Sequence, residues 1–440
     1  MKIIQSPYQI EVFGSKKDWI KFFALILAMF LISIAFEYRN YKAFLSTKTI
    51  ETQVLLQYKK PDKNYYILKL KSLKGEVFYT TSRDDLKDLR GRFVSVYGKA
   101  SSDCSFDRYL QSCFFIGFSI SLLSKRDYLE GVKDYISKQH DEIYADKFDE
   151  FGANLFAQMY NALIFATPMP KTLRDSANIF GIAHIFAISG FHLSILALVF
   201  YGILSLPYRA LQRRFFTYRN EFYDLNFIVL IFAFLYLIIL QFSPSFLRSF
   251  VMFAFGIFVL YRGLKLLSFK LLFAAVLFIL ALFPKIFFSI GFWLSVSGIF
   301  YIYLCLKHIK IANKFLYAVI LNILVSLNML PIAHFFFFVF SPYVALSPFI
   351  TMAFVVFYPL SLGLHIVGFG GIFDRILSLV VNHQFFYIEL KTSLIFLCGF
   401  LALSLLAIRQ KVAYYAVNVV SLLFFFVGVY KFIKGFYENF

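Results

Sequence analysis

The stretch GIAHIFAISGFHLSIL, residues 181–196, opens a nearly continuous series of apolar runs that extends to residue 432. Another apolar run covers 20–36, and only 16% of the 440 residues are charged, compared with about 25% in typical soluble domains. A helix needs about 20 apolar residues to cross a bilayer. The sequence therefore predicts a polytopic α-helical membrane protein with about ten transmembrane helices.

The apolar run at 20–36 lacks the small-residue cleavage pattern of a signal peptide, so we expect a retained first helix. About nine further spans are expected after residue 180. Their centres lie near residues 195, 234, 254, 276, 297, 324, 357, 399 and 422. The stretch 368–391 is too polar and too rich in glycine for a simple helix, and it predicts an interfacial or re-entrant segment.

The formal net charge is +19, and basic residues concentrate in the segments 207–219, 261–270 and 307–314. Short loops rich in Lys and Arg mark the cytoplasmic side of a membrane protein. The nearly uncharged loops around 243–245 and 283–287 should face outward. This pattern predicts a multi-pass protein of the cytoplasmic (inner) membrane with its N-terminus in the cytoplasm, and it leaves the topology after residue 365 open. Contact with anionic lipids accounts for part of the positive charge.

The chain is expected to have five parts. They are a cytoplasmic basic tail (1–19), the first transmembrane helix (20–36), an extracytoplasmic OB-like β domain (45–122), amphipathic interfacial helices (123–175) and a transmembrane bundle (176–440). The β domain contains five strand-like runs, and the stretch RDDLKDLR (83–90) predicts a short helix between the third and fourth. This is the layout of an OB-fold, a small barrel that often binds oligonucleotides, although other five-stranded modules share the pattern.

The four cysteines fall into two pairs of different character. Cys104 and Cys113 lie nine residues apart in the β domain, and an extracytoplasmic location would allow them to form a disulfide. Cys305 and Cys398 lie inside predicted spans, where we expect them to serve only in packing.

The opening stretch also carries His184, Ser189, Gly190 and His192 within nine positions. Polar side chains are costly in hydrocarbon and usually face the interior of a bundle or a water-filled path. On one continuous helix the two histidines would share a face, and Gly190 predicts a break or very close packing. A metal site would need further ligands, and none accompanies them at ligand spacing. A Ser–His hydrolase would need a third orienting residue. A row of polar side chains that runs through the bundle is therefore favoured. The interpretations as a metal site or as a hydrolase stay open.

The longer stretch FGIAHIFAISGFHLSIL strongly resembles the signature of the ComEC family of competence proteins, inner-membrane channels that admit single-stranded DNA during natural transformation. The matching residues are Gly181, His184, Ala187, Ile188, Ser189, Gly190 and His192. The segments SPSFLRSFVM (243–252) and GFWLSVSG (291–298) resemble later landmarks of the family, and Pro331, Pro348 and Pro359 fall where the family has prolines. The resemblance covers most of the chain and implies a DNA channel.

Many family members continue into a metallo-β-lactamase-like domain, and this sequence has no H-x-H-x-D-H cluster. We therefore expect no enzymatic activity, no catalytic residues, no metal and no cofactor. The sequence has no Walker A motif, so any ATPase would be a separate protein. The resemblance implies single-stranded DNA, membrane lipids, a DNA-receptor protein, a cytoplasmic ATPase or helicase and single-strand-binding proteins as partners.

Two groups of residues are the expected DNA contacts. The expected path through the bundle comprises His184, Ser189, Gly190, His192, Ser243, Ser245, Arg248 and Ser295. The expected entrance on the β domain comprises Lys69, Lys71, Arg90, Arg92, Lys99, Tyr66 and Tyr97, where basic residues would hold phosphates and aromatic rings would stack on bases. Transport of another anionic substrate, such as a lipid or an envelope glycan precursor, is the main alternative. An intramembrane hydrolase is the second.

Overall fold

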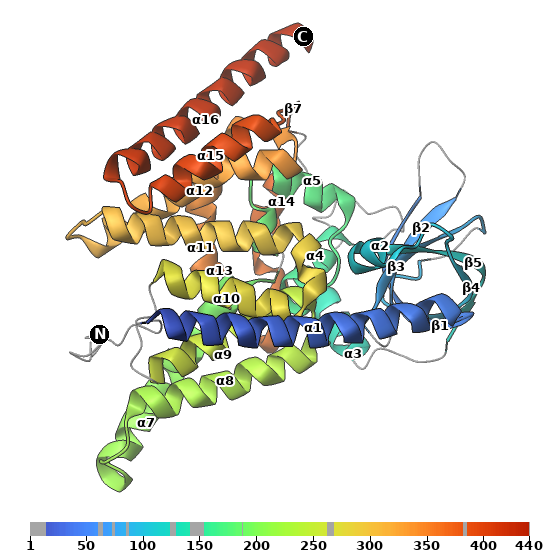
Figure 1. Cartoon of the computed structure of the whole chain (residues 1–440), viewed down its shortest axis with the longest axis horizontal. Coiled ribbons are helices and arrows are strands. Elements are labelled where there is room, and N and C mark those ends of the chain that lie inside the picture. Colours follow the sequence, from blue (N-terminus) through green and yellow to red (C-terminus); the bar gives the residue numbers. More distant parts are fainter. Residues whose placement is uncertain are drawn as a thin grey trace. The chain divides into compact units, whose positions relative to one another are not determined.

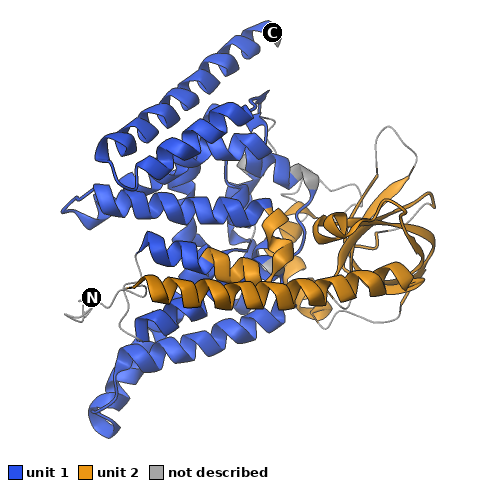
Figure 2. Cartoon of the chain, viewed as in Figure 1, with its two compact units in different colours: residues 1–14, 162–275, 290–440 blue, residues 15–161, 276–289 orange. Residues whose placement is uncertain are grey.

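The computed structural model describes residues 15–59, 65–72, 75–84, 88–123, 129–140, 154–186, 188–261, 268–381 and 385–439. The chain forms two compact units (Figure 2). One comprises 15–161 and 276–289 and contains a β-barrel, and the other comprises 162–275 and 290–440 and consists mainly of helices. Of the expected cytoplasmic tail, residues 1–14 lie outside the described residues.

The first helix, α1 (Lys16–Ser46), includes the whole predicted span 20–36 (Figure 1). Its start is fixed by a capping box, in which the Ser15 hydroxyl accepts the Asp18 N–H while the Asp18 carboxylate accepts the Ser15 N–H. This arrangement satisfies two backbone donors that a helix start otherwise leaves free. With 31 residues, α1 is longer than a bilayer requires.

Five strands follow and close into a barrel. They are β1 (Thr49–Lys59), β2 (Tyr66–Ser72), β3 (Val77–Ser82), β4 (Phe93–Ala100) and β5 (Cys113–Leu122). Their order is β1-β2-β3-β5-β4, and all neighbours are antiparallel except the parallel pair β3–β5. Side chains that alternate along the strands, such as Leu68, Leu70, Val94 and Val96, are completely buried in the barrel core. The five predicted strands are confirmed, and the OB-fold assignment stays a prediction.

The helix of the β domain lies in a different place from the predicted one. It is α2 (Phe106–Gln111), between β4 and β5 rather than between β3 and β4. Within 83–90 the described residues are not helical, and 85–87 lie outside the description. Two amides of this stretch have other partners: the Leu89 N–H donates to the side chain of Gln57 on β1 at 2.8 Å, and the Asp84 N–H donates to Ser82. These amides serve a turn and a neighbouring strand instead of a helix.

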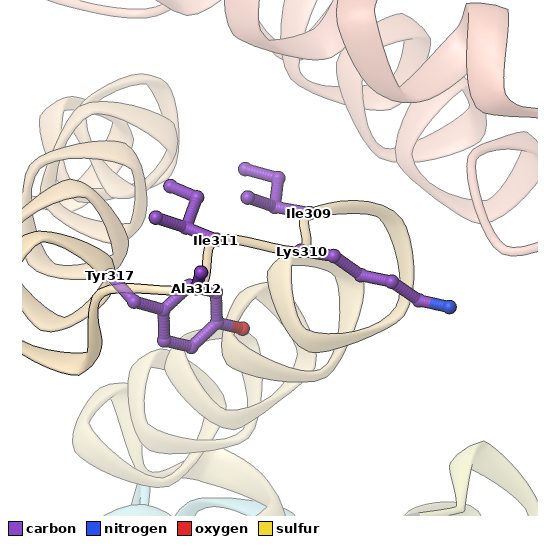
Figure 3. A pocket seen from close by; sticks show the side chains of 5 residues that line it. All are labelled: Ile309, Lys310, Ile311, Ala312 and Tyr317. Atoms are coloured by element: carbon purple, nitrogen blue, oxygen red, sulfur yellow. The ribbon is translucent and has the colours of Figure 1, made fainter.

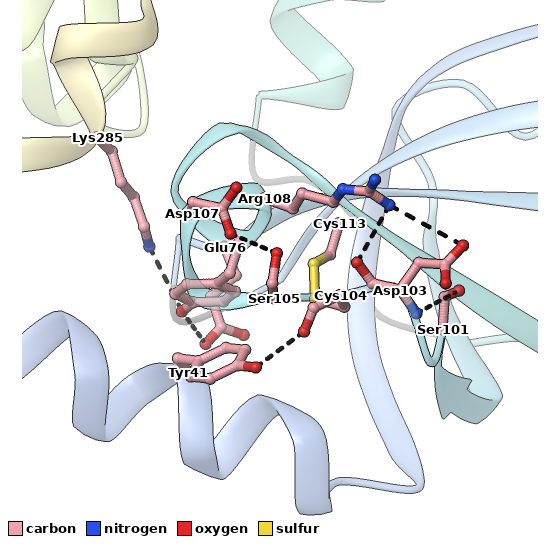
Figure 4. Close-up of a disulfide and its surroundings, with 11 residues drawn as sticks. Tyr41, Glu76, Ser101, Asp103, Cys104, Ser105, Asp107, Arg108, Cys113 and Lys285 are labelled. Atoms are coloured by element: carbon pink, nitrogen blue, oxygen red, sulfur yellow. Dashed lines mark hydrogen bonds and ion pairs between the residues drawn. A yellow bond between two sulfur atoms is a disulfide. The ribbon is translucent and has the colours of Figure 1, made fainter.

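The predicted disulfide Cys104–Cys113 is present and flanks α2 (Figure 4). Near it, Lys285 of the short helix η2 (Pro284–Phe288) pairs with Glu37 of α1 at 2.8 Å. The Lys285 ammonium also lies 4.4 Å from the centre of the Tyr109 ring, and the Tyr109 hydroxyl donates to Glu76. Burial, helped by the Glu76 and Glu37 carboxylates, raises the pKa of Tyr109 far above its usual value. This network joins α1, α2, η2 and Glu76, the residue before β3, within one unit.

The expected interfacial region contains the helices α3 (Glu130–Ser137), α4 (Leu155–Phe165) and α5 (Lys171–Ile179). Residues 124–128 and 141–153 of this region lie outside the described part of the chain. Most of α4 is buried, including Leu155, Phe156 and Tyr160. The placement of these helices at a membrane surface stays a prediction.

The helical unit contains most of the remaining helices. The long ones are α7 (Gly190–Phe215), α8 (Glu221–Ile239), α9 (Pro244–Tyr261), α11 (Ile290–His308), α12 (Lys314–Phe336), α13 (Ser347–Val367), α15 (Leu394–Leu406) and α16 (Lys411–Asn439). Helix α10 (Phe269–Leu282) belongs to this unit up to residue 275 and to the other unit from residue 276. Within the described residues, seven helices are long and apolar enough to cross a membrane, so the predicted count of about ten is not confirmed. The helices at the predicted centres 254, 276 and 399 are α9, α10 and α15, which are shorter. At 1.5 Å per residue, the 13 residues of α15 reach only part of the way across a 30 Å core.

The stretch 368–391 is divided among short elements, as its composition predicted. These are η4 (Gly370–Phe373), α14 (Asp374–Val381) and β7 (Ile388–Glu389), and β7 pairs with β6 (Val339–Phe340). Residues 382–384 lie outside the description. The expectation that no simple helix fills this stretch is confirmed for the described residues.

Polar side chains bind the last long helices to one another. Asn328 of α12 donates to Asn418 of α16 at 2.9 Å, and Ser421 of α16 donates to Asn328 at 2.8 Å. Tyr301 of α11 and Ser404 of α15 are hydrogen-bonded at 3.0 Å. Each bond satisfies groups that would be costly to leave unpaired in an apolar bundle. These contacts fix which faces of α11, α12, α15 and α16 meet.

A glycine in α16 provides a test of this packing. A Cβ atom built at Gly428 would lie 2.4 Å from Cζ of Phe340, whose side chain is completely buried. We expect Gly428→Ala to cost about 1–3 kcal/mol, as overpacking generally does, and to lower the thermal unfolding midpoint of the purified protein in detergent. Gly363→Ala is the control, because a Cβ there has open space. Equal midpoints for the two variants would show that the α16–Phe340 contact is not tight.

Candidate functional site

The polar stretch of 181–196 begins with a tight turn. Gly181 has a φ of +67°, and a Cβ there would lie 3.0 Å from Val344. Its carbonyl accepts hydrogen bonds from His184 Nδ1 at 3.1 Å and from Ser347 Oγ at 3.2 Å. Glycine is thus required at position 181 both by the backbone conformation and by the close approach of the Val344 side chain. The turn anchors the short helix α6 (Ala183–Phe186) to the start of α13.

Ser189 ends this irregular segment and starts α7. Its backbone is extended, with φ −135° and ψ −177°, and its hydroxyl accepts the Phe191 N–H at 3.3 Å. The Ser189 N–H in turn donates to His192 Nδ1 at 3.3 Å, which completes a capping box. The predicted break is confirmed. The expectation that His184 and His192 share one face of a continuous helix is wrong, because the cap separates them into two helices.

The two histidines have opposite surroundings. His184 is exposed, whereas His192 is completely buried. Rings of α13 enclose His192: Phe354 lies 5.2 Å away and Tyr358 4.9 Å away, both edge-on. His192 Nε2 makes no hydrogen bond within the part of the chain that the structure describes. A buried nitrogen left without a partner costs about 1–3 kcal/mol, and other buried atoms such as His334 Nε2 are in the same state.

Helix α8 joins the same cluster through Tyr236. The Tyr236 hydroxyl donates to the Ile164 carbonyl at 2.5 Å and lies 3.3 Å from the Tyr358 hydroxyl. Sequence reasoning missed both Tyr236 and Tyr358. The sequence feature that could have identified Tyr358 is its phenol group within an apolar run, directly before Pro359.

Helix α9 approaches the start of α7 from another side. A Cβ built at Gly190 would lie 3.5 Å from Ser249 Oγ, and Ser249 donates to the Ser245 carbonyl. The turn before α9 is strained, since Gln241 and Phe242 have φ values of +51° and +53°. Left-handed conformations of such residues cost energy and gather at functional sites. The predicted helix start at Pro244 is confirmed.

The structure thus brings together most of the expected path residues. Ser189, Gly190 and His192 lie at the start of α7, and the half-buried residues Ser243, Ser245 and Arg248 lie at or before the start of α9. Ser295 is exposed on α11, and among the described residues no side-chain hydrogen bond joins it to this group. Ala187 lies outside the description. The α7–α9 group is therefore the core of the candidate site.

The geometry favours backbone organisation over chemistry at Ser189. A hydrolase dyad needs a hydrogen bond between the serine oxygen and a histidine nitrogen, but Ser189 Oγ accepts a backbone N–H and His192 Nδ1 accepts another. Within the described ranges, no group of three or more His, Cys, Asp or Glu side chains could hold a metal ion.

The expected entrance residues fall into groups on different strands of the barrel. On β2, Lys69 lies 5.7 Å from the Tyr79 ring, and the Tyr66 ring receives Lys59 at 5.8 Å. Lys71 follows on the same strand, and burial lowers the pKa of its ammonium. Arg90 differs from the others, because Asp88 pairs with it at 2.6 Å.

Tyr97, Lys99 and Arg92 are exposed on or beside β4. Next to them the outward residues of β5 are apolar, and Phe118 lies 6.1 Å from Tyr97. Phe114, Ile116 and Phe118 are 40%, 37% and 61% exposed. The sequence analysis assigned β5 only as a strand, although the alternation in CFFIGFSISLL (113–123) contained this outward set.

The cap itself can be tested by stability. We expect Ser189→Ala to lower the unfolding midpoint in detergent, at a cost of about 0.5–2 kcal/mol for the lost cap. Ser189→Asn keeps an N-cap acceptor and should restore most of the loss. Ser194→Ala, five residues further into α7 where the hydroxyl only bonds back to Gly190, should change little. A similar loss for the Asn and Ala variants would contradict the capping role.

The family comparison covers the residues of this candidate site. Residues 166–434, more than half of the chain, match the family model described as competence protein, and the match includes all of α6, α7, α8, α9 and α13. No curated protein and no solved structure matches the chain. The match and the long apolar helices together make it a multi-pass membrane protein. The chain belongs to the ComEC family of competence proteins.

Proposed function

We propose that the chain moves single-stranded DNA across the cytoplasmic membrane during natural transformation. Family membership links it to DNA uptake in competence. The observation that carries the finer proposal is the meeting of two helix starts, those of α7 and α9, beside Arg248 within the matched region. Helix starts present N–H groups and partial positive charge, which favour phosphate.

A transported strand imposes a strict electrostatic requirement. Each phosphate carries a negative charge, and an isolated charge costs of order 20 kcal/mol to move into a medium of low dielectric constant. A path therefore needs water, hydrogen-bond donors and positive charge. Arg248 supplies a permanent cation. Ser245, three residues earlier on α9, and Ser243, just before the helix, supply hydroxyls. In this proposal these residues contact the strand.

His192 has a different role in the proposal. Because it is buried among Phe354 and Tyr358, it positions the α7 start rather than touching the strand. His184, which is exposed, and the serine hydroxyl groups are nearer to any aqueous space. Polar residues of this kind inside a bundle typically line a path or stabilise its walls.

The barrel supplies the entrance in this proposal, on the extracytoplasmic side. The Lys69–Tyr79 and Lys59–Tyr66 pairs place cations over rings on β2 and β3. Tyr97 and Phe118 give exposed rings with Lys99 nearby in the β4–β5 register. Cations and rings that alternate in this way bind a strand without sequence preference.

The path is tested by import into cells. We expect Arg248→Ala to reduce the entry of labelled DNA into the cytoplasm by about tenfold or more, since a charge-assisted hydrogen bond contributes about 1.5–3 kcal/mol. Capture of DNA outside the cytoplasm should persist. Arg248→Lys keeps the charge and should retain part of the import.

Arg375→Ala is the matched control. Arg375 is exposed and belongs to α14, a different helix that is far from α9 in the sequence. All variants are compared at equal protein abundance in the membrane. Normal import by Arg248→Ala would remove this residue from the path. Normal import by a clean deletion would overturn the DNA proposal and favour another anionic substrate.

The entrance is tested on the full-length protein in detergent with a fluorescent oligonucleotide. We expect the double variant Lys69→Gln, Lys99→Gln to weaken binding and to flatten the salt dependence, because each lost phosphate contact reduces the slope by about 0.7. Arg90→Gln should leave the slope unchanged, since Asp88 already neutralises Arg90. A slope unchanged in the double variant would exclude these lysines.

A further inference from the structure

Two loops of the helical unit are held together at one end of its helices. His308, the last residue of α11, hydrogen-bonds the Ala407 carbonyl at 2.8 Å, and Lys307 donates to the Ile408 carbonyl at 2.5 Å. The His308 ring also stacks on Tyr414 with 4.9 Å between centres. Figure 1 shows the α11–α12 and α15–α16 connections at the same end. The two loops therefore present one surface.

This surface, called here the α11–α16 basic surface, carries five exposed cations. They are Lys307, Lys310, Lys314, Arg409 and Lys411. No Asp or Glu occurs in 307–314 or in 407–411. Among the described residues, none of the five forms an ion pair with a carboxylate. The α11–α16 basic surface therefore has a net positive charge that no carboxylate of the described residues neutralises.

The α7–α8 loop differs from this surface in that carboxylates neutralise part of its charge, although Arg213 and Arg214 there are also exposed. There, Arg209 pairs with Glu221 at 2.8 Å, and Arg219 pairs with Asp224 at 2.7 Å. A rule that only places cations on one side of a membrane would apply equally to both loops. The α11–α16 basic surface differs in that none of its five cations has a carboxylate partner among the described residues, so an external anion could bind there.

Apolar groups accompany these cations. A pocket of about 370 Å³ is lined by Ile309, Lys310, Ile311, Ala312 and Tyr317 (Figure 3). In Figure 3 the Lys310 side chain extends away from Ile311 and Tyr317, so the charged group is separate from the apolar wall. Beside the cations, Phe315 and Val412 are 72% and 79% exposed. A ligand for this surface must offer both an anionic group and an apolar portion.

We propose that the α11–α16 basic surface binds an anionic phospholipid. The headgroup phosphate would lie among Lys310, Lys314 and Arg409, and an acyl chain would lie along the exposed apolar side chains at the helix ends. Basic pockets between membrane helices are suited to such headgroups. A nucleic acid could use the cations and stack on Phe315, but it would gain little from the aliphatic wall of Ile309 and Ile311 and from the exposed Val412, which an acyl chain would cover. This proposal does not depend on DNA transport.

The test compares lipid retention in native mass spectrometry of the full-length protein, purified in detergent and supplied with phosphatidylglycerol or phosphatidylcholine. We expect preferential retention of phosphatidylglycerol. The double variant Lys310→Gln, Lys314→Gln should weaken it roughly 25-fold, at about fivefold for each cation near the headgroup. Phosphatidylcholine retention should not change.

The control is Lys431→Gln, Lys434→Gln, which removes two exposed cations from the other end of α16 and changes the net charge equally. It should retain phosphatidylglycerol like the unaltered protein. An equal loss in both doubles would reduce the effect to net charge and overturn the proposal. Unchanged lipid retention with weaker oligonucleotide binding in the first double would assign the surface to nucleic acid instead and would also overturn it.

Discussion

The capping box of Ser189 and His192 is the interaction on which the helical unit most depends. A helix start leaves backbone N–H groups free, and an apolar bundle offers no water to satisfy them. Ser189 accepts one N–H, and His192 accepts another. This pair allows an otherwise apolar run to stop and restart inside the bundle. The restart turns Gly190 toward α9 and buries His192 against α13, so the position of three helices follows from one polar turn.

The same rule explains how the rest of the unit is assembled. Isolated polar residues in the later helices find partners on neighbouring helices, as Asn328 does with Asn418 and Ser421. Positive charges at the helix ends differ in whether they are neutralised. Carboxylates pair with Arg209 and Arg219, whereas the cations of the α11–α16 basic surface have no such partners among the described residues. The proposals rest on three features: the buried ring of His192, the left-handed turn before α9 and the cations that have no carboxylate partner among the described residues.

Much of the site could be anticipated from residues close together in sequence. The break at Ser189, the helix start at Pro244 and the Cys104–Cys113 bridge each depend on neighbouring residues and are confirmed. The predictions were wrong where the local structure depends on residues that are distant in the sequence. The helix predicted at 83–90 failed because Gln57, on another strand, takes the Leu89 N–H. His184 and His192 lie in two different helices because α6 ends at Phe186 and Ser189 starts the new helix α7. The cluster of Tyr236 and Tyr358 with His192 joins three segments that no local pattern connects.

The sequence by itself determined the class of protein, because apolar run length and low charge are properties of the chain alone. It also determined the family, through a motif whose residues are adjacent, and the five strands, through their alternation. Only the tertiary structure decided which apolar runs form long helices, which cations keep a free charge and which rings enclose His192. Each of these depends on a partner far away in the sequence. Lys285 and Lys310 are the same residue type, and only the fold places Glu37, far away in the sequence, against the first and leaves the second exposed.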